Sequence, residues 1–272
     1  MTKKALCVGI NDYPYDGSDL NGCVNDARAW ADLLVSHYDF PSANVKLLFD
    51  SQATKANVLA GLKALLAGAK AGDVLVFTNS SHGTYQPDTS GDEPKYDEAL
   101  CPYDCGENLI VDDELRGVFK MELPKDVHLT VISDSCFSGS VTRVVVGEFI
   151  PGLKTPDDRR VRFLSPALRG QPILQNPWKA APKRKEKYPE SGMKEILLSG
   201  CTDREYSYDA FIQGKYHGAM TYYALQAIRE ANYQLTYQQL HSRLLFLLDD
   251  AGYNQHPRLE GRAANKKRPL FT

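Results

Sequence analysis

Short apolar runs rich in β-branched residues alternate along the chain with stretches whose apolar positions recur every three or four residues. The apolar runs are residues 4–10, 44–49, 73–78, 127–132 and 194–201. The stretches with helical spacing are residues 25–36, 54–69, 217–231 and 236–250. Buried strands and amphipathic helices have these two patterns, and their alternation is typical of βαβ units. The pattern predicts an α/β fold with a mostly parallel central sheet and helices on both faces.

Three segments do not fit this alternation. Residues 85–95 predict a polar loop, and residues 256–260 predict a last strand at an edge of the sheet. Residues 147–192 are rich in proline and basic residues without sustained periodicity, which predicts a long exposed linker. The chain thus divides into an ordered region 1–146, the basic linker and a second ordered region 193–272 of the same domain.

Composition and charge exclude several classes of function. The 272 residues carry a net charge of −2, so the overall electrostatic field favours neither nucleic acid nor an anionic membrane. No apolar run approaches the ~20 residues that cross a bilayer, and the N-terminus has no signal-peptide pattern. Six scattered cysteines suit a reducing compartment, and Cys101 and Cys105 lack the second ligand pair of a zinc site. We expect a cytoplasmic monomer without nucleic-acid or membrane partners.

The candidate chemistry follows two of the predicted strands. Residues 73–78 lead into Asn79-Ser80-Ser81-His82-Gly83, and residues 127–132 lead into Ser133-Asp134-Ser135-Cys136. The carboxyl ends of parallel strands line one crevice, so His82 and Cys136 can meet there. An imidazole takes the proton of a thiol and later returns it to a leaving amine. The backbone N–H groups of Gly83 and Cys136 are then candidate oxyanion donors. The alternative is a buried structural cysteine and an unrelated loop histidine, and spacing alone leaves it open.

Several motifs together resemble the metacaspases, a family of the caspase-like cysteine peptidase clan. They are Leu20-Asn21-Gly22-Cys23-Val24-Asn25-Asp26, Ser80-Ser81-His82-Gly83, Asp134-Ser135-Cys136-Phe137-Ser138-Gly139, Ser199-Gly200-Cys201-Thr202-Asp203 and Gly218-Ala219-Met220-Thr221. The resemblance covers most of residues 4–140 and 192–260. It implies a caspase-like fold, with a large-subunit-like catalytic region before the linker and a small-subunit-like region after it. It also implies that His82 is the general base and Cys136 the nucleophile.

The same resemblance implies a specificity pocket. Its lining is formed by Cys23, Asp26, Ser80 and Asp134. Two carboxylates select a cation, so the implied enzyme is an endopeptidase that cleaves protein substrates after exposed arginine or lysine. The plainer interpretation makes Asp26 a first-turn helix residue and Asp134 a cap at the end of a strand. The chain departs from the family at Ser81 and Phe137, where glycine and histidine are usual, but neither change removes a catalytic group.

A calcium site is the other feature that the resemblance implies. Asp97, Asp112 and Asp113 fall at three of the family's carboxylate positions, but Arg143 replaces the fourth. A cation among the ligands weakens a site for a hard ion, so we expect no required cofactor and little or no need for calcium. Asp112 or Asp113 also suits the N-cap of a short helix that runs to Phe119.

The pocket and the linker together predict self-cleavage. The candidate sites in the linker are Arg159, Arg160, Arg162 and Arg169, since extended loops are where peptidases cut most readily. The alternative for the linker is a basic loop that docks an acidic partner. The alternative for the whole chain is a catalytically silent caspase-like scaffold, which the retention of both His82 and Cys136 disfavours.

Overall fold

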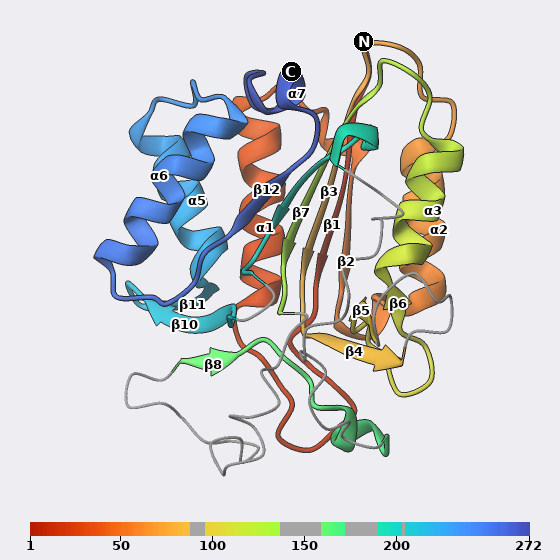
Figure 1. Ribbon diagram of the computed structural model, residues 1–272, viewed down its shortest axis with the longest axis vertical. Coiled ribbons are helices and arrows are strands. Elements are labelled where there is room, and N and C mark those ends of the chain that lie inside the picture. The colour runs from red at the N-terminus through yellow and green to blue at the C-terminus, as the bar shows by residue number, and fades with distance from the viewer. Residues whose placement is uncertain (88–95, 137–158, 172–189, 203–204) are drawn as a thin grey trace.

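A six-stranded sheet forms the centre of the protein (Figure 1). The computed structural model describes residues 1–87, 96–136, 159–171, 190–202 and 205–272. The strand order is β12-β9-β7-β3-β1-β2. These strands are β1 (Lys3–Gly9), β2 (Val45–Phe49), β3 (Val74–Ser80), β7 (His128–Asp134), β9 (Ile196–Ser199) and β12 (Arg258–Glu260). All neighbours pair in parallel except β12, which is antiparallel at one edge, so the predicted mostly parallel sheet and last edge strand are confirmed.

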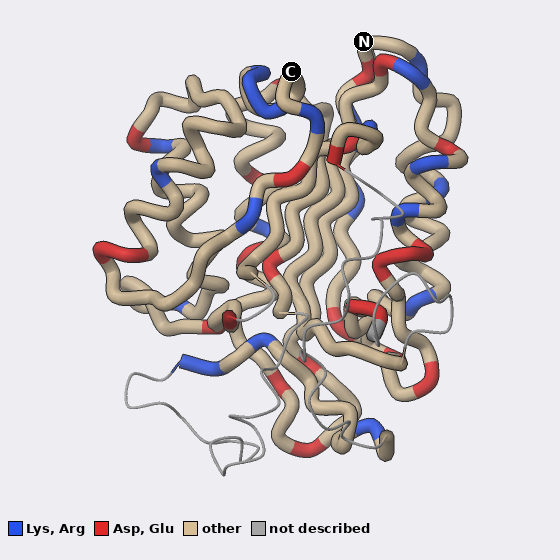
Figure 2. Tube along the Cα trace, in the orientation of Figure 1, with Lys and Arg blue, Asp and Glu red and all other residues tan. Residues whose placement is uncertain are grey.

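Helices cover both faces of this sheet (Figure 1). On one face lie α1 (Cys23–His37), α5 (Ala219–Glu230) and α6 (Tyr237–Asp250), and on the other α2 (Lys55–Leu66) and α3 (Asp112–Glu122). Alternate side chains of β1 point to opposite faces of the sheet. Ala5 and Cys7 pack with α1, whereas Leu6 and Val8 pack with α2. The central strands are largely free of charged residues, which gather at strand ends and on the helices (Figure 2). A strand buried on both faces needs this composition.

Two helices begin directly after a capping threonine. The Thr54 hydroxyl accepts from the backbone N–H of Asn57 at the start of α2, and Thr236 forms a capping box at the start of α6. The expectation that Asp112 or Asp113 caps a helix is wrong, because α3 begins at Asp112 itself, after Val111, without a side-chain cap. These carboxylates instead occupy the first turn, where their negative charge interacts favourably with the helix dipole.

Two small sheets lie near the carboxyl ends of the central strands. One contains β4 (Gly83–Pro87), β5 (Tyr96–Leu100) and β6 (Ile110–Val111), and the other β8 (Arg160–Val161), β10 (Tyr208–Ile212) and β11 (Lys215–Gly218). The predicted loop from residue 85 is therefore wrong for residues 85–87, which belong to β4. In the described part of the chain no helix is both long and apolar enough to cross a membrane.

The expectation of an exposed linker is wrong for the segment around Arg162. Arg160 and Val161 form a strand that pairs with β10, and the Arg162 side chain is 0% exposed. Composition indicated exposure because arginine and proline are rarely buried. Burial is possible here because carboxylates from distant parts of the chain surround the guanidinium, which no local pattern reveals.

Candidate active site

The register of the central strands brings the two candidate catalytic residues to one edge. Ser80 at the end of β3 aligns with Asp134 at the end of β7. His82 and Cys136 each follow by two residues, so both stand just beyond the same edge of the sheet. The prediction from the strand ends thus agrees with the observed topology.

Two hydrogen bonds orient His82, one to a backbone carbonyl and one to a tyrosine hydroxyl. Its Nε2 lies 2.6 Å from the carbonyl oxygen of Ser18, and its backbone N–H donates to the hydroxyl of Tyr13 at 3.1 Å. Because a carbonyl only accepts, Nε2 carries the proton and Nδ1 keeps its lone pair. Nδ1 is buried and has no hydrogen-bond partner among the described residues. Burial lowers the pKa of His82 to about 4, so the imidazole is neutral at pH 7 and can accept a proton.

The thiol of Cys136 is fully buried beside a second cysteine. Its Sγ donates to the carbonyl oxygen of Glu205 at 3.1 Å and lies 3.7 Å from Sγ of Cys201. The contact with Cys136 and burial raise the pKa of Cys201, which therefore stays a thiol. Sequence reasoning did not place Cys201 in the site. Its signal was the small-residue turn after β9, a pattern like those that follow β3 and β7.

An extended peptide, residues 160–164, lies across these strand ends. The carbonyl oxygen of Arg162 accepts from the backbone N–H groups of Gly83 at 3.0 Å and of Cys136 at 3.2 Å. The N–H of Arg162 donates to the carbonyl of Ser207 at 2.9 Å. The strand just before Arg162 pairs antiparallel with β10, as a bound peptide pairs with the edge of a sheet. The two predicted oxyanion donors therefore hold one carbonyl of the chain itself.

The side chain of Arg162 fills the predicted pocket. Its Nη2 lies 2.7 Å from Oδ2 of Asp26 and 3.0 Å from Oδ1 of Asp209. Its Nη1 lies 2.6 Å from Oγ of Ser80 and 3.4 Å from Oδ2 of Asp134. The structure thus brings three of the predicted pocket residues around one guanidinium. It adds Asp209, which lies in β10 and which no sequence pattern distinguished.

Cys23, the fourth predicted pocket residue, is buried at the start of α1. Burial raises the pKa of its thiol, and the charge of Arg162 opposes that shift. Burial likewise raises the pKa of Asp26 above its ordinary value, with Arg162 again opposing the shift. The pocket is therefore electrostatically suited to a cation and poorly suited to remain empty.

Backbone donors fix the three carboxylates. Asp26 accepts from the N–H of Gly218, and Asp134 accepts from the N–H and hydroxyl of Thr221. Asp209 accepts from the N–H groups of Asn21 at 2.8 Å and Gly22 at 2.9 Å. Such fixed dipoles hold the acidic side chains around the guanidinium.

Two glycines permit the close packing at this site. A Cβ on Gly83 would lie 2.2 Å from the carbonyl oxygen of Cys136. A Cβ on Gly218 would lie 2.1 Å from Oδ2 of Asp134 and 2.5 Å from Nη1 of Arg162. These distances exclude any side chain at either position, so glycine is needed for the approach of the backbone and of the guanidinium.

The other three predicted cleavage-site arginines lie outside the pocket. The guanidinium of Arg159 packs 4.0 Å from the ring centroid of Tyr253, and Arg160 donates to the carbonyl of Asp19 at 2.6 Å. Arg169 donates to the carbonyl of Tyr85 at 3.4 Å. The geometry therefore distinguishes Arg162 from its neighbours.

The three predicted calcium ligands lie on two elements of the described chain. Asp97 lies in β5, while Asp112 and Asp113 begin α3, where Nε of Arg116 is 3.5 Å from Oδ2 of Asp112. Burial raises the pKa of Asp112 to about 6, and a nearby cation would lower this pKa again. Nevertheless, within the described ranges no three His, Cys, Asp or Glu side chains are grouped as a metal requires. Arg143, at the fourth position, lies outside the described residues.

The fold defines the class of the protein. Caspase-1 from Spodoptera frugiperda has the same fold, with a TM-score of 0.58 and 10% identity over 95% of this chain and 86% of that chain. The crystal structure of GSU0716 from Geobacter sulfurreducens is similar over 100% of this chain and 99% of that chain, with a TM-score of 0.74 and 24% identity. The chain therefore has the caspase-like fold.

Comparison of the sequence then identifies the family. The family model of the metacaspase peptidase C14 domain matches residues 3–145. Metacaspase-1A of Aspergillus oryzae is 35% identical over 292 residues, which cover 95% of this chain and 67% of that protein. Metacaspase-6 of Arabidopsis thaliana is 43% identical over 148 residues, but these cover only 52% of this chain and 39% of that protein. The chain belongs to the metacaspase family of cysteine peptidases.

Proposed function

We propose that this metacaspase is an endopeptidase that cleaves after arginine, and less efficiently after lysine, and that it cuts itself between Arg162 and Phe163. The observation that carries the proposal is the position of Arg162. Its guanidinium is enclosed by three carboxylates, while its carbonyl oxygen accepts two N–H groups beside Cys136. A substrate residue before a scissile bond needs both contacts at once.

The residues of the site support a thioester mechanism. The Cys136 thiol releases its hydrogen bond to the Glu205 carbonyl, and Nδ1 of His82 takes its proton. The sulfur then attacks the carbonyl carbon of Arg162. The N–H groups of Gly83 and Cys136 stabilise the resulting oxyanion. The bond to the nitrogen of Phe163 then breaks, and His82 delivers its proton to that departing amine.

Water completes the reaction. His82, neutral again, removes a proton from a water molecule that attacks the thioester between Cys136 and Arg162. The sulfur leaves and takes from His82 the proton that His82 removed from water. Arg162 ends in a free carboxylic acid, which ionises to a carboxylate at neutral pH. Oxidation states do not change, so no redox partner or cofactor is needed.

The shape of the charge favours arginine over lysine. Nη2 contacts Asp26 and Asp209, whereas Nη1 contacts Asp134, as the separate nitrogens of a planar guanidinium allow. An ammonium is a single point charge and cannot satisfy all three carboxylates in the same geometry. We therefore expect lysine substrates to be cleaved more slowly.

Incubation of the purified chain tests the proposal. Wild type should yield a new N-terminus at Phe163, read by mass spectrometry, whereas Cys136→Ala and His82→Ala should stay intact because the covalent route is lost. Arg162→Gln should also stay intact, while the matched variant Arg160→Gln, whose side chain lies outside the pocket, should be cut. An intact wild type that hydrolyses arginine peptides would remove self-cleavage from the proposal, and turnover by Cys136→Ala would overturn the peptidase assignment.

A further inference from the structure

The residue that follows Arg162 is enclosed by aromatic and sulfur-containing side chains. Phe163 is 2% exposed, and its ring stacks on Tyr85 with centroids 5.9 Å apart and planes at 23°. Cys136 and Cys201 belong to the same buried cluster. The two rings and the candidate nucleophile therefore belong to one buried cluster.

Backbone contacts fix the direction of the Phe163 side chain. Gly83 donates to the carbonyl of Arg162 at 3.0 Å and accepts from the N–H of Leu164 at 2.9 Å, so it clamps Phe163 from both sides. The hydroxyl of Thr84 also donates to the carbonyl of Leu164 at 2.8 Å. In a peptide held in this way, the side chain of the residue after the scissile bond points in a single direction.

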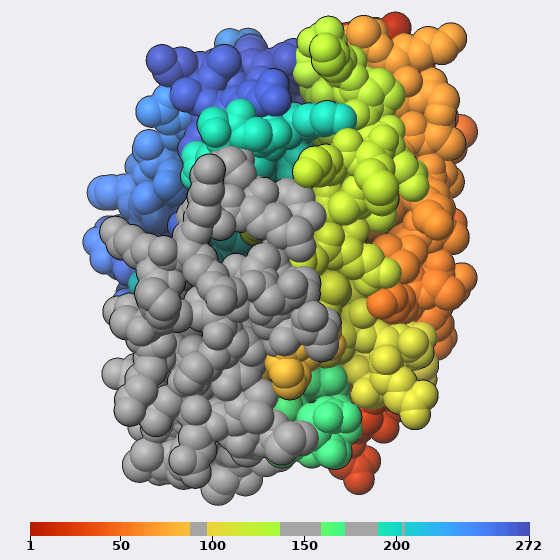
Figure 3. Space-filling model, turned by 45° about the vertical axis from the view of Figure 1, so that its right-hand side comes forward, coloured from red at the N-terminus to blue at the C-terminus, as the bar shows by residue number. Residues whose placement is uncertain are grey.

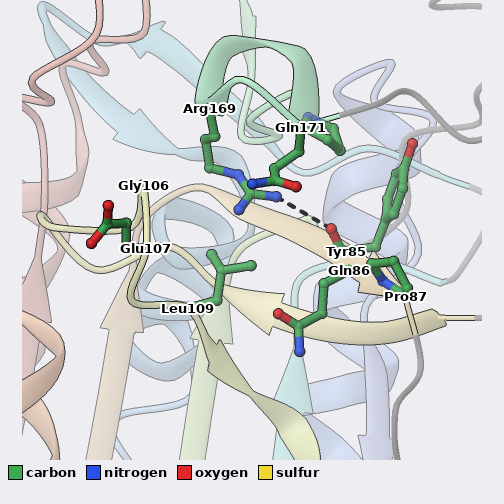
Figure 4. Close-up of a pocket in the computed structure, with 9 residues that line it drawn as sticks. Tyr85, Gln86, Pro87, Gly106, Glu107, Leu109, Arg169 and Gln171 are labelled. Atoms are coloured by element: carbon green, nitrogen blue, oxygen red, sulfur yellow. Dashed lines mark hydrogen bonds between the residues drawn. The ribbon is translucent and has the colours of Figure 1, made fainter.

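The partner ring belongs to the framework of the site. Tyr85 lies two residues after Gly83 in β4, so both positions face the same side of that strand, toward Cys136. Figure 4 shows the guanidinium of Arg169 directed at the Tyr85 carbonyl, with the ring of Tyr85 pointing away from it. In the space-filling view the segment that contains Arg169 lies at the surface beside β4 (Figure 3). Arg169 thus contacts the backbone of Tyr85, while the ring of Tyr85 stacks on Phe163 and forms a wall of the enclosure.

From these contacts we propose that the site contains a subsite for an aromatic residue immediately after the scissile bond, with Tyr85 as its specificity-determining residue. The substrates are then proteins with arginine followed by phenylalanine, tyrosine or tryptophan. This inference rests on the proposed function, since it takes the Arg162–Phe163 bond as a seated substrate. The subsite also positions the departing nitrogen, because that nitrogen belongs to the residue whose ring is fixed.

The chemistry of the enclosure sets an order of preference. Stacked rings gain more than their buried area alone provides, whereas alanine leaves the space beside Tyr85 unfilled. A carboxylate at this position loses its hydration without gaining a partner. The order expected for the residue after arginine is phenylalanine, then leucine, then alanine, with aspartate last.

Peptide hydrolysis by the full chain, incubated until self-cleavage is complete, tests this order. Internally quenched peptides of the form Gly-Val-Arg-X-Leu differ only at X, and Val-Arg aminomethylcoumarin amide serves as the substrate without a residue X. Phenylalanine should exceed alanine in kcat/KM by about tenfold or more. Tyr85→Phe should keep this ratio, and Tyr85→Leu should reduce it to about twofold because a similar volume remains without the ring.

The outcomes separate the subsite from the reaction. Equal hydrolysis of the four peptides, or a ratio that Tyr85→Leu leaves unchanged, overturns the subsite while the peptidase assignment stands. Failure to hydrolyse any peptide and the coumarin amide overturns the proposed function and the subsite with it. Hydrolysis of the coumarin amide without preference for phenylalanine also counts against the subsite alone.

Discussion

Asp209 is a buried carboxylate that we expect to contribute to specificity for arginine. It lies 3.0 Å from Nη2 of Arg162 and is held by two backbone N–H groups, so its negative charge is fixed at the pocket wall. Asp209→Asn should lower kcat/KM on arginine substrates by roughly tenfold to a hundredfold, the scale of a lost charge-assisted hydrogen bond of about 1.5–3 kcal/mol. Steady-state kinetics on an arginine coumarin amide measure the effect.

A matched surface change provides the control. Asp249→Asn removes the same charge from an exposed position on α6 and should leave kcat/KM unchanged within error. Equal kinetics for Asp209→Asn and wild type would mean that only Asp26 and Asp134 recognise the substrate cation.

The buried imidazole gives a pH dependence. His82 must be neutral to accept the thiol proton, and burial lowers its pKa to about 4 while Arg162 occupies the pocket. At pH 5.5 the base is then almost wholly neutral, whereas a histidine with an ordinary pKa near 6.5 would be only about one tenth neutral. Self-cleavage at pH 5.5 should therefore proceed within about twofold of its rate at pH 7.5, and should fall only as the pH approaches 4.

Timed electrophoresis of freshly refolded chain at each pH measures these rates. The nearby charges of Asp209 and Arg162 act on His82 in opposite directions, so burial decides the sign. A tenfold loss of rate between pH 7.5 and 5.5 would show that the imidazole titrates as if exposed to solvent.

At the same scale, the sequence was informative where a residue ends a core strand. His82 and Cys136 were predictable because a strand, a polar turn and a glycine form a local pattern. Asp209 and Cys201 reach the site through β10 and the turn after β9, and their roles depend on contacts across the fold. The small-residue turn at Cys201 indicates the end of a strand, but no local pattern indicates the contacts of Asp209.

At the scale of elements, β8 and the residue after it behave as an internal ligand. β8 pairs with β10. The guanidinium of Arg162 lies among three carboxylates, which would face each other without a cation if it were removed. In a Cys136→Ala background, which prevents cleavage, Arg162→Ala should lower the free energy of unfolding by about 3–5 kcal/mol because the buried charges lose their partner. Chemical denaturation of both variants measures the difference.

A soluble guanidinium compound distinguishes the pocket from a general loss of packing. Agmatine should raise the Tm of Cys136→Ala/Arg162→Ala and leave Cys136→Ala unaffected, because Arg162 fills the pocket in the latter. Arg160→Ala, outside the pocket, is the matched control and should show neither effect. A Tm of the double variant that is insensitive to agmatine would mean that the pocket collapses without Arg162.

The linker also shows the limit of composition as a guide to elements. The strands of the central sheet were predictable because each buries an apolar run on both faces. β8 was not predictable, because it has only two residues and both are half buried. Its pairing depends on β10, which lies nearly fifty residues further along the chain. β4 was missed for the related reason that its apolar content is a single tyrosine within a polar sequence.

At the scale of the whole molecule, we expect little need for calcium, because a cation, Arg143, stands at the fourth of the family's carboxylate positions. The described residues form no three-ligand group, and Arg116 already lies beside Asp112. Chelation followed by millimolar calcium or magnesium should therefore change arginine-peptide hydrolysis by less than about twofold, since hard-cation sites depend on several oxygen ligands. A large restoration specific to calcium would show that ligands outside the described ranges complete a site.

We expect cleavage after Arg162 to divide the sheet between two fragments that stay associated. β7 lies in residues 1–162 and β9 in residues 163–272, and they are neighbours in the interior of one sheet, paired from Thr130–Ile196 to Ser133–Ser199. The helices α1 and α5, one from each fragment, bury Trp30 and Leu225 in the same core cluster. Separation would expose this apolar surface and leave strand hydrogen bonds unmade, so the cut chain should elute as a single species at the mass of the uncut chain. Size-exclusion chromatography with mass spectrometry, in buffer and then in denaturant, should show both fragments in one peak first and in two afterwards. Two peaks in buffer alone would mean that the linker, and not the shared sheet, holds the molecule together.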